Sequence, residues 1–209
     1  KSLETIGERC FRGCSALTGS ITIPEGMTSI GQSTFEGCSN LQEIILPESL
    51  TDIGDYAFYG CSKLKNINLP DGLLTIGNYA FNGAQIDFLV IPTSVKSIGD
   101  YAFSNCISIT SLSFPNSVKS IGLSAFSNNA ALESVTFPDA LETLDDYAFQ
   151  NCTSIESVSL GNTLKTIGAS VFKGCTELVN LTLSEGLESI GHYAFSGCVS
   201  LVAVNLYPA

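Results

Sequence analysis

A motif of about 23 residues recurs along the whole chain and constrains its fold more than any other feature. One phenylalanine marks each copy, and the nine positions are Phe11, Phe35, Phe58, Phe81, Phe103, Phe126, Phe149, Phe172 and Phe195. The intervals between them are 24, 23, 23, 22, 23, 23, 23 and 23 residues. A unit this short cannot bury its own apolar face and has to stack on its neighbours. The period therefore predicts a repeat solenoid.

Each unit divides into three segments. The pattern Leu-x-x-Ile-x-Leu-Pro, as in residues 41–47 and 64–70, predicts a short parallel-sheet strand with one buried face, ended by proline. The pattern Leu/Val-x-x-Ile-Gly, as in residues 95–99, predicts a second short extended segment. Its glycine indicates a positive φ or a close backbone approach, and Asp145 replaces it once because Asp tolerates the left-handed conformation. The pattern Tyr-Ala-Phe-x-x-Cys predicts a helical or 3-10 turn that closes the coil.

Two units depart from the common length. The extra residue lies in LTGSITIP, where Gly19 indicates a bulge or a looser turn. The missing residue falls after Ala84, where GAQ replaces a longer GCSK-type turn.

The complete pattern, L-x-x-I-x-L-P-x-x-L-x-x-I-G-x-x-A-F-x-x-C-x-x, resembles the BspA-like, or Treponema-type, leucine-rich repeats over the whole chain. The block IG-x-x-AF-x-x-C is its most specific part. The resemblance implies a mainly β, right-handed superhelix of about nine coils, with residues 1–209 forming a single leucine-rich-repeat solenoid truncated within repeats at both ends. It also implies an extracellular or cell-surface protein, with adhesion or host-protein binding as the typical function. Such repeats have no fixed binding motif, so the resemblance transfers no site residue.

Composition narrows the class of partner. The net charge of −11 disfavours nucleic acid and anionic membrane surfaces. No apolar run approaches the roughly 18 residues that span a bilayer, so we predict no membrane insertion in this chain. The apolar share of 44% is ample for a core.

Seven of the eight cysteines occupy one position of the repeat: Cys14, Cys38, Cys61, Cys106, Cys152, Cys175 and Cys198. Ala84 and Asn129 hold this position in the other two units. Since the position accepts alanine, we interpret it as a small buried filler and predict free thiols, with bridges between adjacent units as the alternative. No Cys-x-x-Cys pair exists, and Cys10 and Cys14 lack histidine partners, so we predict no metal site.

The chain offers no catalytic constellation. The one histidine, His192, occupies a variable position that we expect to be exposed, and nucleophilic catalysis would depend on it alone. Carboxylates such as Asp145 and Asp146 lie on repeating outer positions and are expected to form a solvated acidic face. The sequence therefore predicts no enzyme and no cofactor.

The outward positions of the first strand are mostly Ser, Thr and Asn. Phe88 and Val90 are the exceptions, two coils away from Ile45, and exposed apolar side chains tend to mark contact sites. The candidate ligand-binding residues are Phe88, Val90, Ile45, Glu43, Asn66 and Asn68. The alternative is that Phe88 folds over the shortened turn at Ala84 and Gln85.

A second column of the repeat is aromatic. Its members are Tyr56, Tyr79, Tyr101, Tyr147 and Tyr193, with Ser124 and Ser170 as interruptions. Such a stripe either packs against neighbouring turns or binds sugars or partners. Separately, Asn151-Cys-Thr and Asn180-Leu-Thr match the N-glycosylation acceptor pattern, which matters only on a eukaryotic secretory route.

Together these features predict a non-enzymatic protein-binding or adhesion scaffold that presents its strand face to a protein ligand, such as a host extracellular protein. One alternative is a structural spacer or self-stacking component of a cell-surface layer or filament, whose partners are further copies of the repeat. Another is glycan binding by the Ser/Thr positions of the strand face.

Overall fold

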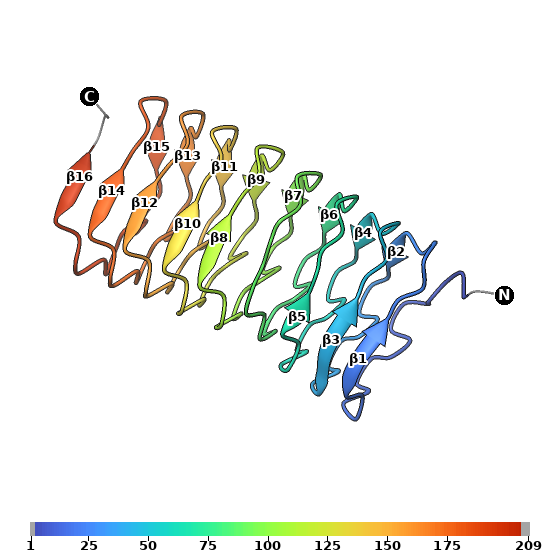
Figure 1. Ribbon diagram of the computed structural model, residues 1–209. Coiled ribbons are helices and arrows are strands. Elements are labelled where there is room, and N and C mark those ends of the chain that lie inside the picture. Colours follow the sequence, from blue (N-terminus) through green and yellow to red (C-terminus); the bar gives the residue numbers. More distant parts are fainter. Residues whose placement is uncertain (1–2, 206–209) are drawn as a thin grey trace.

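The computed structural model describes residues 3–205, so the predicted limits at residues 1 and 209 lie outside the described residues. The chain winds into a parallel β-solenoid whose coils stack side by side (Figure 1). The predicted solenoid is confirmed. Every strand pairs in parallel with its counterpart in the neighbouring coil, at the spacing set by the 23-residue period.

Each coil contributes to two rows of strands. The back row is one eight-stranded sheet: β2 (Ser29–Ile30), β4 (Asp52–Ile53), β6 (Thr75–Ile76), β7 (Ser97–Ile98), β9 (Ser120–Ile121), β11 (Thr143–Leu144), β13 (Thr166–Ile167) and β15 (Ser189–Ile190). The front row begins with β1 (Gly19–Thr22), β3 (Leu41–Ile45) and β5 (Asn66–Ile67). It continues with β8 (Ser111–Ser113), β10 (Ser134–Thr136), β12 (Ser157–Ser159), β14 (Asn180–Thr182) and β16 (Ala203–Asn205). The register between β1 and β3 shifts at Gly19, which confirms the predicted bulge.

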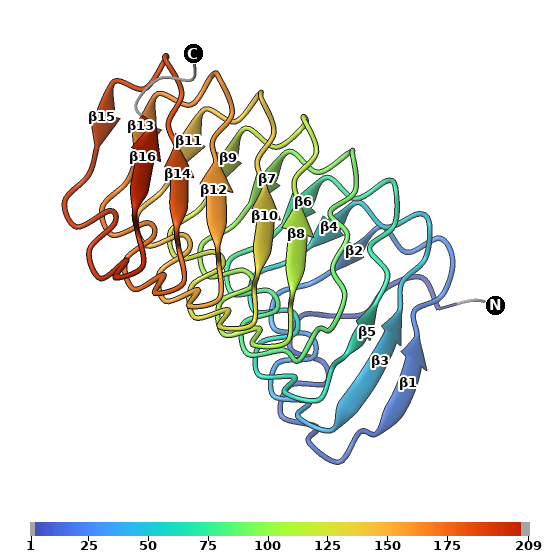
Figure 2. The same ribbon diagram turned by 60° about the vertical axis from the view of Figure 1, so that its left-hand side comes forward.

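The front row is broken at the short coil. Residues 86–91 form no strand, so a three-stranded sheet (β1-β3-β5) and a five-stranded sheet (β8 to β16) face the same side. The prediction of one front strand per coil is therefore wrong here. The back row continues without interruption, since β6 pairs with β7. The shorter repeat therefore changes the front row and leaves the back row intact. Figure 2 shows β1, β3 and β5 tilted away from the row of β8 to β16.

The closing turn is not helical. Residues 3–205 contain no helix, which corrects the predicted helical or 3-10 turn. Its amides bond alternately: Phe126 N donates to Ala148 O of the next coil (2.8 Å), whereas Ser127 N donates to Ser124 O of the same turn (3.1 Å). Every second amide of the turn donates its hydrogen bond to the next coil, so the hydrogen bonds of a helix cannot form. Left-handed residues, such as Ser124 (φ 52°) and Asn128 (φ 61°), produce this alternation.

The core is a column of stacked phenylalanines. Successive rings from Phe11 to Phe195 lie 5.1–5.7 Å apart, with interplanar angles of 13° or less. The seven rings from Phe35 to Phe172 are fully buried. Rows of Ile, Leu and Val from both sheets pack around the column, as the repeat predicts.

The cysteines are free thiols and do more than fill space. Five of the seven in the repeat position are buried, whereas Cys14 is exposed and Cys198 half-buried. Cys106 Sγ donates to the Phe81 carbonyl of the preceding coil at 3.2 Å. Six of the seven cysteines at this position, Cys106 among them, make such a bond. Asn129 makes the equivalent bond from Nδ2 to Phe103 O, at 3.1 Å. The position therefore supplies a donor as well as a small side chain.

The repeated glycine is required by close approach and not by a positive φ. A Cβ on Gly122 would lie 2.7 Å from Asp100 Oδ1 and 3.0 Å from Asp100 N in the preceding coil. None of these repeat glycines has a positive φ; the left-handed residues lie two positions later, at Tyr101 and its counterparts. Asp145 has no positive φ either, so left-handed tolerance does not explain its presence.

Candidate functional site

The front face alternates as the sequence predicts. In β8, β10 and β12 the central Leu or Val is buried and both flanking Ser or Thr are exposed. Parallel pairing aligns these side chains in register, for example Ser134 with Ser111. From β8 to β14 the front face is therefore a small-residue polar surface.

The break in the front row changes that surface. Phe88 is 72% exposed and Val90 57% exposed, while Leu89 between them is buried. Phe88 does not fold over the shortened turn, since it faces solvent while Ala84 is already buried, and that alternative is wrong. Ile45 at the end of β3 is 47% exposed. These three side chains form the apolar patch of the front face.

Two grooves meet at Phe88. The first, of about 550 Å³, lies between β3, β5 and the short coil; its walls include Glu43, Ile45, Asn66, Asn68 and Phe88. The second, of about 230 Å³, lies between the short coil and the strands β8 and β10; its walls include Phe88 and Val90. The six candidate residues chosen from the sequence thus all line one of these two grooves.

The first groove has an acidic rim. Glu25, Glu43, Glu48 and Asp87 line it, with Lys65 as the one cationic side chain among its lining residues. Lys65 Nζ lies 3.9 Å from Asp87 Oδ2, and both side chains are at least half exposed. This pair is solvated and contributes little to stability. The groove consequently offers an apolar wall beside an excess of negative charge.

The short coil also lacks backbone pairing. Within residues 3–205, no backbone–backbone hydrogen bond involves an amide or carbonyl of residues 86–91. The signal for this was present in the sequence as the 22-residue interval between Phe81 and Phe103. That interval indicates a shorter turn, but it does not by itself show that the strand after the turn is lost.

The remaining predicted groups lie elsewhere. His192 is exposed, as expected, on the closing turn. Asn151 donates from Nδ2 to Asn128 Oδ1 at 2.9 Å, and Asn180 lies exposed on β14. Among the described residues there is no group of three or more His, Cys, Asp or Glu side chains placed to hold a metal ion. The same residues include no helix able to cross a membrane.

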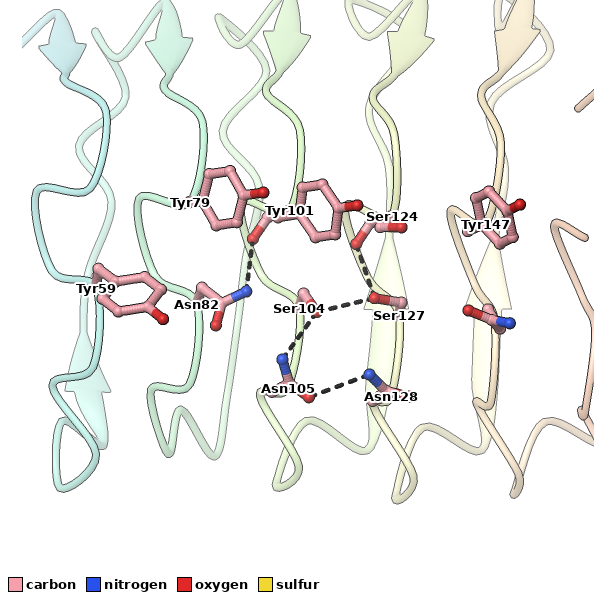
Figure 3. A pocket seen from close by; sticks show the side chains of 11 residues that line it. Tyr59, Tyr79, Asn82, Tyr101, Ser104, Asn105, Ser124, Ser127, Asn128 and Tyr147 are labelled. Carbon is pink, nitrogen blue, oxygen red and sulfur yellow. Dashed lines mark hydrogen bonds between the residues drawn. The ribbon is translucent and has the colours of Figure 1, made fainter.

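The tyrosine column lies on the closing turns. Tyr56, Tyr79 and Tyr101 stack at 4.8 and 4.6 Å, which confirms the packing interpretation for these three. Tyr59 packs edge-on against Tyr56 and Tyr79. A groove of about 450 Å³ lies beside the column, where Ser124 replaces a ring. Figure 3 shows the side chains that line it.

Comparison with known proteins places these features in a family. The profile of the "BspA type Leucine rich repeat region (6 copies)" family matches residues 1–110 and 96–208. A crystal structure of a leucine-rich repeat protein from Bacteroides ovatus is similar at 33% identity and a TM-score of 0.73. A leucine rich cell surface protein from Faecalibacterium prausnitzii is similar at 26% identity and a TM-score of 0.61. The T. pallidum leucine-rich repeat protein is 33% identical, with a TM-score of 0.55.

These matches cover nearly the whole chain but only part of the larger proteins. The chain is covered to 95%, 96% and 83%, and it spans 57%, 62% and 70% of the three chains in the same order. No curated protein sequence matches the chain.

Proposed function

Because the chain belongs to the BspA-type leucine-rich repeat family, we propose that it is a non-enzymatic scaffold that holds a protein ligand at the break in its front face. One observation carries the proposal: Phe88, the most exposed side chain of the apolar patch, lies where two grooves meet. The repeat does not need an aromatic side chain there, because the equivalent positions of other coils hold Glu43, Asn66 and Ser111. Exposed apolar patches with a polar rim are typical of protein contact sites.

The groove chemistry narrows the kind of ligand. The apolar wall of Ile45 and Phe88 suits an aliphatic or aromatic anchor, and the acidic rim suits lysine or arginine beside that anchor. The unpaired backbone of residues 86–91 adds donors and acceptors that an extended segment can use. A segment that combines one apolar anchor with flanking basic residues fits this surface.

The location of the protein belongs to the same proposal. The F. prausnitzii relative is described as a cell surface protein, which supports an extracellular or cell-surface location for this chain. The corresponding ligand class is a host extracellular protein.

The test is capture followed by an affinity measurement. The immobilised chain is incubated with a mixture of serum and extracellular-matrix proteins, the retained proteins are identified by mass spectrometry, and the Kd of each is measured in solution. We expect Phe88→Asp to weaken binding at least tenfold without lowering the thermal unfolding midpoint, because the side chain is exposed.

The matched control is Ile107→Asp. Ile107 is also an exposed apolar side chain in mid-chain, but it lines neither groove, so its replacement leaves the affinity unchanged. If the Phe88→Asp variant binds the ligand as tightly as the original chain does, the binding site does not include the apolar patch. Growth of particle size with concentration and no retained ligand would favour the self-stacking alternative.

A further inference from the structure

The tyrosine column has a gap the size of one ring. Tyr79 and Tyr101 stack at 4.6 Å, the next coil carries Ser124, and Tyr147 follows in the coil after that. Tyr101, Ser124 and Tyr147 all line the groove of about 450 Å³ (Figure 3). Two coil spacings separate the two tyrosines, about 9.5 Å at ordinary strand spacing, so the gap holds one ring between their faces.

The backbone at the gap keeps the geometry of the column. Ser124 has a φ of 52°, close to the 55° of Tyr101 and the 60° of Tyr147. Its side chain is buried at the floor of the groove. The backbone at Ser124 therefore has the same conformation as at the tyrosine positions, and only the aromatic ring is missing.

The other serine interruption, Ser170, is not open in this way. Beside Ser170, the side chain of Lys173 extends over the next ring, with Nζ 6.0 Å from the Tyr193 centroid. Ser33 stands at the same repeat position before the first tyrosine, and the coil before it carries Arg9 there. Only at Ser124 do tyrosines lie on both sides without a long side chain from the same coil, because the counterpart of Lys173 is Ser127.

The residues at the bottom of the gap have short side chains. Ser127 Oγ donates to Ser124 O at 3.1 Å and lies 2.8 Å from Ser104 Oγ. Both serines are buried, and their bonds hold them against the wall of the coil. These short side chains therefore do not fill the space between Tyr101 and Tyr147.

The rim of the groove is neutral and rich in amides. Asn82, Asn105, Asn128 and Gln150 line it, and none of its lining residues carries a charge. Asn128 Nδ2 donates to Asn105 Oδ1 at 3.1 Å, which orients the amide pair beside the gap. A ligand here meets aromatic faces on two sides and neutral donors and acceptors at the edge.

We propose that the gap between Tyr101 and Tyr147 binds one pyranose ring of a neutral oligosaccharide. A pyranose has apolar C–H faces that pack on aromatic rings and equatorial hydroxyls that pair with amides. A purely aromatic ligand would make no use of the remaining donor and acceptor capacity of the rim amides, and an anionic sugar would find no cation among the lining residues. The groove continues past Tyr79 toward Tyr59, which leaves room for neighbouring sugar units. The site lies on the closing turns and is independent of the patch at Phe88.

The test uses neutral hexasaccharides of glucose, mannose and N-acetylglucosamine as probes, titrated into the chain and followed by calorimetry and saturation-transfer NMR. We expect at least one probe to bind with a millimolar or tighter Kd. Ser124→Tyr restores the missing ring, so it should weaken that binding at least tenfold without lowering the unfolding midpoint. Tyr147→Ala removes one wall from an exposed position and should weaken it at least fivefold, which provides a second test if Ser124→Tyr disturbs the coil.

Ser170→Tyr is the matched control, since it makes the same substitution at the interruption occupied by Lys173 and should leave binding unchanged. The proposal is overturned if no probe binds at millimolar concentration, or if the chain with Ser124→Tyr or Tyr147→Ala binds as tightly as the original. Loss of binding in Ser170→Tyr equal to that in Ser124→Tyr would also overturn it, because the effect would then not belong to the gap.

Discussion

At the scale of single residues, the cysteine position shows what a pattern of residue types can and cannot reveal. Acceptance of Ala84 correctly indicated a small buried site, but it concealed the hydrogen bond that each buried thiol donates to a phenylalanine carbonyl. The better signal was Asn129, whose amide makes the same bond from the same position. Residue volume was thus predictable from the sequence, whereas the polar role depended on where the neighbouring carbonyl points.

Burial of these thiols makes stability depend on pH in the alkaline range. Burial raises the pKa of the Cys106 and Cys152 thiols from 9.0 to about 12. As the pH rises past 9, the unfolded chain loses thiol protons while the folded chain keeps them, so the free energy of unfolding falls between about pH 9 and pH 12. Urea titrations at several pH values measure this slope.

The control for the thiol prediction is Cys106→Ala, since alanine already occupies the position at Ala84. The prediction concerns the difference in slope between the original chain and this variant, so alkaline effects that both share cancel. The alanine variant should show a shallower alkaline decline. Identical slopes would contradict a contribution from the buried thiol.

The phenylalanine column supports a prediction of stability. Phe126 is fully buried and stacks on Phe103 at 5.3 Å and on Phe149 at 5.5 Å. Phe126→Ala should therefore lower the free energy of unfolding by roughly 3–5 kcal/mol, measured by chemical denaturation. Phe11→Ala should cost less, because that ring is only partly buried. A loss below about 1 kcal/mol for Phe126→Ala would mean that the column is not the core.

At the scale of the repeated elements, side-chain acceptors of the preceding coil lie beside the repeated glycine in several coils. Asn78 N donates to Asp55 Oδ1 in the preceding coil (2.7 Å), and Asp100 N donates to Asn78 Oδ1 (2.8 Å). A side chain on the glycine of the upper coil would meet this oxygen: a Cβ on Gly99 would lie 2.8 Å from Asn78 Oδ1. Backbone atoms of the preceding coil lie equally close, since the same Cβ would be 2.7 Å from Asn78 N.

Asp145 is the exception in the glycine column. The coil beneath it carries Leu123, which has no acceptor oxygen, and Asp145 Oδ1 itself accepts the Asp146 amide at 3.1 Å. The sequence reveals the glycine column and its exception, but tolerance of the left-handed conformation does not account for Asp145, because its φ is not positive. The contacts that a side chain makes at this position involve residues about 22 positions apart, and only the stacking of the coils brings them together.

This arrangement predicts coupling between positions 123 and 145. Leu123→Asp alone should destabilise the chain by about 1 kcal/mol or more, because the new carboxylate meets the Asp145 side chain at the position that glycine occupies elsewhere. Adding Asp145→Gly recreates the arrangement of Asp100 beneath Gly122 and should recover most of the loss. Chemical denaturation of both single variants and the double variant gives the coupling energy, expected at about 0.5 kcal/mol or more. Strict additivity would contradict the explanation.

At the scale of the whole molecule, one missing residue divides the front row and not the back. The period predicted the stack, the strand positions and the outward side chains, because each of these repeats in every coil. It could not predict the broken strand at residues 86–91, since pairing there depends on both neighbouring coils at once. Phe88 stood out in the sequence by its residue type, while the two grooves beside it followed only from the break.

The break predicts the effect of an insertion. One serine placed between Ala84 and Gln85 brings the interval from Phe81 to Phe103 up to the 23 residues of most other coils. Residues 86–91 should then reach the register of β5 and β8, pair with both and join the two front sheets. We expect slower amide hydrogen exchange at residues 87–91 and a higher unfolding midpoint. The same insertion after Gly60, in a coil of regular length, is the control and should lower the midpoint by disturbing a coil already in register. Rapid exchange at residues 87–91 in the lengthened chain would show that the residues of this segment, and not its length, keep the front row open.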